Sequence, residues 1–122
     1  MNAPPGIPQG AWDRLTRFQQ LVYAATSRIP RGEVRSYQWV ARRIGRPRAV
    51  RAVGNALHRN PFAPRVPCHR VIRADGTVGG FARGTRRKRA LLAQEGYRVG
   101  AFTRKRANLP TALSLTELRN LA

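Results

Sequence analysis

The chain has 122 residues, enough for one small domain and too few for two ordinary ones. Lys and Arg number 24 against 5 Asp and Glu, which gives a formal net charge of +19. A surface this positive attracts polyanions, and the release of counterions from phosphates makes nucleic acid the expected partner. Charge alone leaves a basic ribosome-associated or RNA-binding protein as an alternative.

The only cysteine is Cys68, so an internal disulfide is excluded. His58 and His69 are the only histidines, too few to complete a structural zinc site with it, and we expect neither a metal nor another cofactor. No apolar run reaches the about 20 residues that cross a bilayer, and the first residues lack a signal-peptide pattern. We expect a soluble monomer without membrane contact, cytoplasmic and nucleoid-associated in a bacterium or nuclear in a eukaryote.

The N-terminal third predicts a lead-in followed by one helix. Residues 1–10 are rich in Pro and Gly and predict a loose segment. From Ala11 to Pro30, apolar side chains recur at the spacing of a single helix: Trp12, Leu15, Phe18, Val22 and Ala25. A turn over residues 31–34 then leads into a short extended piece.

Two short helices are predicted next. Ser36 suits the N-cap of a helix over residues 37–44, because its hydroxyl can accept from free backbone N–H groups, and Gly45 suits its end. Pro47 suits the first turn of the following helix, which runs to about Arg59. Two short helices joined by a Gly-containing turn are typical of a helix-turn-helix motif.

The second of these helices has two unlike faces at about 100° per residue. One face is apolar, with Val50, Val53 and Leu57. The opposite face carries Arg48, Arg51, Asn55 and His58, and small residues flank both faces: Ala49, Ala52 and Ala56. The pattern predicts a helix that packs on a core and enters a DNA groove. A basic solvated face on an ordinary amphipathic helix is the alternative.

The remaining residues predict a hairpin, a loop and a last helix. Residues 59–67 contain three prolines and predict a constrained loop, and residues 66–72 are predicted to be extended. Asp75-Gly76 is a turn signal that predicts a hairpin between Val71-Ile72 and Thr77-Val78. A loop over residues 79–84 precedes the last helix, from about Thr85 to Glu95, with Leu91 and Leu92 buried and Gly96 at its end.

This organisation predicts one domain over residues 11–98. The basic tail, residues 99–122, has a capping-box spacing before a short apolar C-terminal helix. The fold class is mainly α with a small β-hairpin beside a helix-turn-helix, which is a winged arrangement.

The segment Val66-Pro67-Cys68-His69-Arg70-Val71 is the candidate for chemistry. Cysteine is a strong nucleophile only as its thiolate, which a positive environment favours, and His69, Arg70 and the general excess of Arg could provide one. In an extended segment the ring of His69 points away from the sulfur of Cys68, so we expect a water rather than a direct hydrogen bond between them. Taken without context, Cys68 is more often a small buried hydrophobe with an incidental neighbour.

The string Pro67-Cys68-His69-Arg70-Val71 resembles the active-site signature of the O6-alkylguanine-DNA alkyltransferases, also called methylated-DNA–protein-cysteine methyltransferases. Further blocks resemble this family in the same order: Ile29 to Gln38, Arg51 to Leu57, Asn60-Pro61, Gly76 to Phe81 and Leu91 to Gly96. The resemblance implies the family's C-terminal domain, with a winged helix-turn-helix fold.

The resemblance implies irreversible transfer of an alkyl group from O6-alkylguanine in DNA to Cys68, once per molecule. His69, through a water and with Glu95 behind it, resembles the base that takes the thiol proton. Tyr37 resembles the acid that protonates the leaving guanine, whose negative charge needs neutralisation. Taken alone, Tyr37 would fit a core position and Glu95 a surface ion pair.

The resemblance also implies a DNA-binding surface that enters the minor groove of a duplex. Arg51 resembles the finger that fills the stack after the damaged nucleotide swings out, although a phosphate contact alone would also suit an arginine. Close approach of the small residues Ala52 and Ala56 fits this groove. The other residues expected at the DNA are Ser36, Tyr37, Asn55 and Arg48.

A pocket for the flipped base is expected around the cysteine. Asn60 resembles an asparagine that ties the cysteine loop to the helix-turn-helix, and a turn residue is its simpler interpretation. The other residues expected to line the pocket are Pro67, Val78, Gly79, Gly80, Phe81, Ala82 and Arg83. Phe81 stands where tyrosine is usual in the family and Arg83 where glycine is common, which affects the size of the pocket.

Only about ten residues precede the first predicted helix, so we expect the family's usual N-terminal domain to be absent. In length the chain resembles the alkyltransferase-like proteins, which sense the lesion and recruit excision repair without transfer. Those proteins replace the acceptor cysteine, whereas Cys68 is present here. A lesion sensor with an idle cysteine is therefore one alternative, and a winged helix-turn-helix regulator or general nucleic-acid binder is another.

Overall fold

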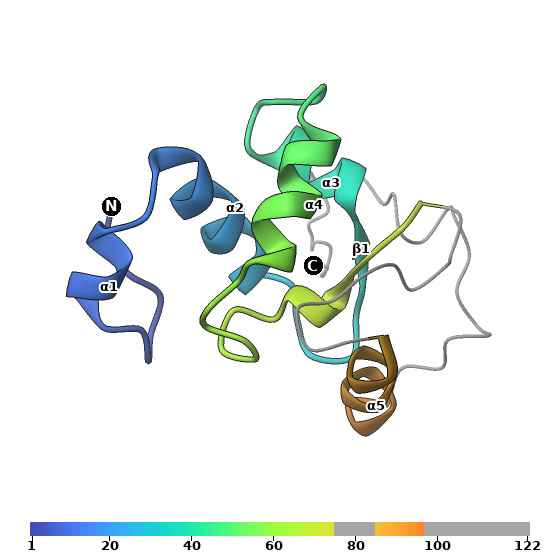
Figure 1. Ribbon diagram of the computed structural model, residues 1–122. Helices are drawn as coiled ribbons and strands as arrows, with labels where there is room; N and C mark the ends of the chain where they lie inside the picture. Colours follow the sequence, from blue (N-terminus) through green and yellow to red (C-terminus); the bar gives the residue numbers. More distant parts are fainter. Residues whose placement is uncertain (75–84, 97–122) are drawn as a thin grey trace.

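The structure, a computed structural model, describes residues 1–74 and 85–96. These residues form a mainly helical fold with a small parallel sheet (Figure 1), which confirms the predicted fold class. The helices are α1 (Gln9–Asp13), α2 (Arg17–Ser27), α3 (Tyr37–Arg43), α4 (Val50–His58), the 3-10 helix η1 (Cys68–Arg70) and α5 (Thr85–Gln94). Within the described residues, no helix has the length and apolar character of a membrane span.

The predicted first helix is in fact two helices that meet at Thr16. The Thr16 hydroxyl accepts a hydrogen bond from the backbone N–H of Gln19 at 3.1 Å, and the Gln19 side chain accepts from the backbone N–H of Thr16 at 2.9 Å. This capping box starts α2 afresh, which hydrophobic spacing alone does not reveal. The predicted loose lead-in also contains the start of α1 and a buried residue, Ile7.

The helix-turn-helix is present, with a longer turn than predicted. The Ser36 hydroxyl caps α3 by accepting from the Trp39 N–H at 3.0 Å, and Gly45 follows α3 with φ of +76°, which favours glycine. Pro47 does not begin α4. It lies in a turn closed by the Ala49 N–H and the Arg46 carbonyl at 2.9 Å, where proline suits the second position, and α4 begins at Val50.

The two strands are parallel. Strand β1 (Arg35–Ser36) pairs with β2 (Val71–Ile72), with Arg35 opposite Val71 and Ser36 opposite Ile72. The extended segment predicted over residues 66–72 is therefore confined to β2, because residues 68–70 turn into η1. The other arm of the predicted hairpin, Thr77-Val78, lies outside the described residues.

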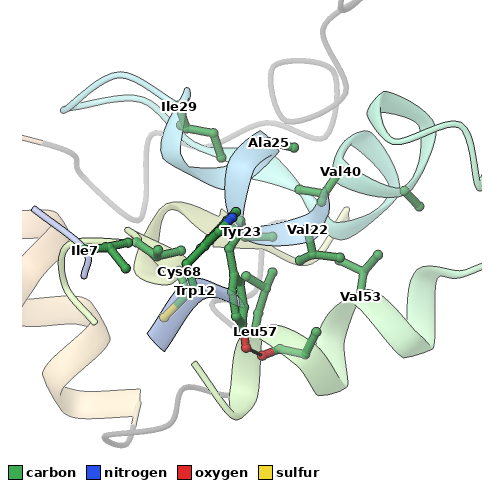
Figure 2. Close-up of a cluster of buried hydrophobic side chains, with 14 residues drawn as sticks. Ile7, Trp12, Val22, Tyr23, Ala25, Ile29, Val40, Val53, Leu57 and Cys68 are labelled. Atoms are coloured by element: carbon green, nitrogen blue, oxygen red, sulfur yellow. Dashed lines mark hydrogen bonds between the residues drawn. The ribbon is translucent and has the colours of Figure 1, made fainter. Parts of the chain in front are cut away.

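The core lies between α1, α2, α3, α4 and η1. Its buried cluster contains Val22 and Tyr23 from α2, Val53 and Leu57 from α4, and also Cys68 (Figure 2). A smaller cluster joins α5 to the sheet: Leu92 packs with Val34 and Ile72. Leu91, predicted to be buried, is only half-buried, while Leu92 is fully buried.

Trp12 of α1 is fully buried in the main cluster. We predict that Trp12→Ala lowers the free energy of unfolding by about 3–5 kcal/mol, because a large cavity is left in a packed core. Chemical denaturation followed by circular dichroism measures the change. Arg14→Ala, at an exposed position next to the same helix, is the control and should change stability by about 0.5 kcal/mol or less. A Trp12→Ala variant as stable as this control would show that α1 is not packed on the core.

Candidate active site

Cys68 is the first residue of η1 and is buried, with 3% of its surface exposed. Its backbone N–H donates to the Val66 carbonyl at 2.8 Å, and the Arg70 N–H donates to the Pro67 carbonyl at 2.9 Å. These bonds wind the segment into a tight turn instead of the extended strand predicted here. Cys68 is therefore the first residue of a fixed turn, and its side chain packs within the main hydrophobic cluster.

Asn60 connects this turn to the end of α4. It is buried, its side-chain N–H donates to the Val66 carbonyl at 2.8 Å, and its side-chain oxygen accepts from the Phe62 N–H at 2.9 Å. Because a buried amide without partners would be costly, these bonds fix the path of the loop between α4 and Cys68.

A buried carboxylate, Glu95, lies behind the cysteine turn. His69 Nε2 is 2.9 Å from Glu95 Oε2, with 1% of the His69 side chain and 7% of the Glu95 side chain exposed. Arg70 binds the same carboxylate with two bonds, from Nε to Oε1 at 2.8 Å and from Nη2 to Oε2 at 2.7 Å. Paired bonds of this kind between Arg and carboxylate are strong and directional. Glu95 thus holds both residues that follow Cys68.

These contacts set the charge states of the two partners. Burial alone would raise the pKa of Glu95, but the hydrogen bonds from Arg70 and His69 outweigh it and lower that pKa to about 2. Burial lowers the pKa of His69, and the contact with Glu95 only partly opposes this. A neutral His69 beside an ionised Glu95 carries its proton on Nε2, which leaves Nδ1 as the basic nitrogen.

The turn before β1 approaches the end of α5 closely. Gly32 has φ of +85°, and a Cβ on it would lie 3.2 Å from the Glu95 backbone carbonyl, so a glycine suits this position. Arg31 donates to the Gln94 carbonyl at 3.2 Å and lies 3.9 Å from Glu95 Oε2. Arg70 also donates to the Ile29 carbonyl at 2.8 Å. The carboxylate is therefore surrounded by α5, η1 and the end of α2.

Tyr37 and Lys88 form a second polar pair near Cys68. Lys88 is fully buried, its Nζ lies 3.3 Å from the Tyr37 hydroxyl, and it sits 5.6 Å from the centre of the Tyr37 ring. Burial lowers the pKa of Lys88 to about 8, while the charge of Cys68 opposes that shift. Burial and the charge of Cys68 raise the pKa of Tyr37, so its hydroxyl keeps its proton at neutral pH.

The register of the sheet explains how a surface pocket forms next to this pair. Because Ser36 pairs with Ile72, the next residues, Tyr37 and Arg73, leave the two strands side by side. Both line an open pocket of 790 Å³, together with the outer face of α4: Val50, Arg51, Gly54, Asn55 and His58. The pocket thus joins the helix-turn-helix surface to Tyr37.

The residues predicted to contact DNA differ in their exposure to solvent. Arg48, Arg51, Ala52 and Asn55 are all exposed, the last three on α4. Ser36 is fully buried, and its hydroxyl is used in the cap of α3, so it is not part of that surface. Pro67 is buried next to Cys68. The rest of the predicted pocket, Val78, Gly79, Gly80, Phe81, Ala82 and Arg83, lies outside the described residues.

Arg70 was predicted only as a positive group near the thiol, not as a partner of Glu95. Three other basic residues of the site were not predicted individually: Arg31, Arg73 and Lys88. Sequence reasoning treated them as part of a general positive charge. One signal pointed to Lys88, since it is one of only two lysines in a chain whose other basic residues are arginines.

Comparison with known proteins identifies the family of the chain and supports its fold. Residues 17–97 match the family described as 6-O-methylguanine DNA methyltransferase, DNA binding domain. The chain belongs to this family. The methylated-DNA–protein-cysteine methyltransferase of Mycobacterium tuberculosis is 53% identical over 88 residues, which are 72% of this chain and 53% of that protein. The chain therefore spans about half the length of this relative.

Two solved structures that resemble this chain were determined in complex with DNA. Mycobacterium tuberculosis OGT in complex with DNA has a TM-score of 0.66 and 55% identity, covering 67% of this chain and 51% of that one. S. pombe Atl1 in complex with damaged DNA containing O6-carboxymethylguanine has a TM-score of 0.62 and 36% identity, covering 68% and 79%. These complexes support DNA binding by the domain and a place for it among DNA-repair proteins.

The low pKa of Glu95 predicts a pH dependence of stability. A carboxylate whose pKa falls from 4.5 to about 2 on folding stabilises the fold above pH 4.5, by about 3 kcal/mol. This stabilisation is lost as the pH falls from 4.5 towards 2. We predict that Glu95→Gln is less stable at pH 7 and loses less stability over that acid range than the original chain.

Denaturant titrations at a series of pH values measure this difference. Glu33→Gln is the matched control, because Glu33 also pairs with an arginine, Arg35 at 2.7 Å, but is 45% exposed. An ion pair that is this exposed contributes about 1 kcal/mol or less. Equal acid sensitivity of the original chain and Glu95→Gln would contradict the assignment of the low pKa to Glu95.

Proposed function

We propose that this protein repairs DNA by moving the alkyl group of O6-alkylguanine to Cys68, irreversibly and once per molecule. The observation that carries the proposal is the linked set Cys68, His69 and Glu95, with Tyr37 near the same thiol. A histidine that is bound to a buried carboxylate and directly follows a cysteine supplies the base and the orienting group that an activated nucleophile needs.

The reaction requires the thiol proton to leave before the sulfur attacks. His69, neutral at pH 7 with Nδ1 as its basic nitrogen, accepts this proton through a water, and ionised Glu95 stabilises the imidazolium that results. The thiolate then forms an S–C bond with the alkyl carbon while the bond from that carbon to O6 of guanine breaks. The products are a thioether on Cys68 and an anionic guanine.

Tyr37 neutralises the leaving base. Its raised pKa keeps the hydroxyl protonated until the base becomes negative, and the Lys88 ammonium beside it lowers the cost of releasing the proton. The proton passes from the Tyr37 oxygen to the guanine, which leaves as a neutral base. Tyr37 is left as a tyrosinate and His69 as an imidazolium, and return of the His69 proton to Tyr37 through solvent restores both groups, so that atoms and charge balance.

The target base reaches Cys68 only outside the duplex, because O6 is inaccessible within the stack. The outer face of α4 approaches the minor groove, where Ala52 permits close contact, Arg51 fills the space of the extruded nucleotide, and Asn55 and Arg48 contact the surrounding DNA. Asn60 holds the loop that carries Cys68 at the end of the same helix. The pocket beside Tyr37 gives the extruded base a path towards the thiol.

Cys68→Ala tests the transfer directly. After incubation with an oligonucleotide containing O6-methylguanine, intact-protein mass should show one added methyl group on the original chain and none on Cys68→Ala. Binding to the same oligonucleotide should remain nearly unchanged in the variant, because the replaced side chain is small and buried. No mass gain by the original chain, together with tighter binding to damaged than to undamaged DNA, would indicate a lesion sensor that recruits excision-repair proteins.

Tyr37→Phe tests the proton donor. We predict that the single-turnover rate of methyl transfer falls by about 10²- to 10⁴-fold, the usual contribution of a positioned acid, with affinity for damaged DNA little changed. Rapid quench followed by mass spectrometry measures the rate. Tyr23→Phe is the matched control: it removes the same hydroxyl from a core tyrosine bonded to the Ala56 carbonyl at 2.7 Å. That control should lose stability but keep the rate.

A further inference from the structure

Helix α5 has an inner face that belongs to the site and an outer face that no part of the proposed mechanism uses. Lys88 and Leu92 point inward and are fully buried. Arg86, Arg87 and Arg89 are exposed. Four basic residues are thus consecutive in a helix that contains no acid.

This outer face has no counter-charge among the described residues. Across residues 1–74 and 85–96, no ion pair joins Arg86, Arg87 or Arg89 to an acid, and the nearest acid along the chain, Glu95, is bound by Arg70 and His69. Arg86 and Arg89 are also three residues apart on one helix, a spacing at which like charges repel. Repulsion among these arginines lowers the stability of the free protein, and a polyanion bound to them would offset this loss.

The contact of Lys88 with Tyr37 brings α5 next to the surface that is proposed to meet DNA. Lys88 contacts the Tyr37 hydroxyl, and Tyr37 lines the pocket under the outer face of α4. Arg73 lines the same pocket and lies close enough to Tyr37 and Lys88 for its charge to lower the pKa of both. A basic path therefore runs from Arg51 on α4 through Arg73 to α5. Figure 1 shows α5 on the side of the molecule opposite α1.

We propose that Arg86, Arg87 and Arg89 form a second phosphate-binding surface. This surface binds the DNA backbone on the side of the Tyr37 pocket that is farther from α4. The inference rests on the proposed function for the DNA partner, but it concerns backbone contacts only. Arginine suits this role because its planar guanidinium binds phosphate oxygens in pairs. The contacts are independent of sequence and of the lesion, so they extend the footprint without adding specificity.

The test compares two triple variants that remove equal charge. One variant is Arg86→Gln, Arg87→Gln and Arg89→Gln. The control is Arg14→Gln, Arg28→Gln and Arg65→Gln, at exposed arginines beside the N-terminal segment, where Arg28 lines a hollow with Met1 and Arg65 packs against Gly6. Fluorescence anisotropy with an undamaged duplex, repeated over a range of salt concentrations, gives the slope of log affinity against log salt. Circular dichroism and melting confirm that both variants fold.

Each lost phosphate contact reduces the slope by about 0.9, so the α5 variant should lose up to about 2.7 and the control much less. Equal slopes for the two variants would overturn the proposal, because net charge alone would then explain the loss. An α5 variant with an unchanged slope would also overturn it. Methyl transfer by the original chain and by the α5 variant is assayed separately. If the original chain transfers no methyl group, the proposed function fails. The comparison of salt slopes then still decides the role of α5.

Discussion

The site depends on the hydrogen bonds that the buried carboxylate of Glu95 accepts. In a chain with 24 basic and 5 acidic residues, this one side chain accepts hydrogen bonds from Arg70 and His69 and lies near Arg31. A buried charge is tolerated only when it is paired, and here the pairing joins α5 to the cysteine turn. The same interaction therefore attaches the last helix and fixes the orientation of the histidine next to Cys68.

Packing and chemistry share the same residues around Cys68. The thiol belongs to the main hydrophobic cluster, Asn60 fixes the loop before it, and the parallel register of β1 and β2 brings Tyr37 and Arg73 to one side. A site built this way holds its groups in place before a substrate arrives, which reduces the reorganisation needed during reaction. It also means that the sulfur of Cys68 is largely shielded from solvent.

The sequence predicted the fold class, the Ser36 cap, the two faces of α4 and the last helix, because each depends on local spacing or on a cap within a few residues. It missed the break at Thr16, where a capping box overrides continuous hydrophobic spacing, and it began α4 too early by assigning Pro47 to a helix.

The 3-10 turn at Cys68 and the parallel pairing of β1 with β2 depend on contacts between distant segments. Cys68 and His69 were singled out from the sequence, whereas their roles and Glu95 came from the family resemblance. The contacts of Arg70 and Lys88 were not predicted, since among so many basic residues no pattern marks which ones turn inward.

The folded domain begins before the segment that matches the family, because α1 and the residues around it belong to the core. The family match begins at Arg17, yet Ile7 and Trp12 lie before that point and complete the cluster that contains Cys68. A sequence family records the positions that its members share, whereas a folding unit includes every residue that closes its core. A fragment trimmed to the family boundary would expose the side of the core that α1 covers. The physical boundary of this domain therefore lies upstream of its evolutionary one.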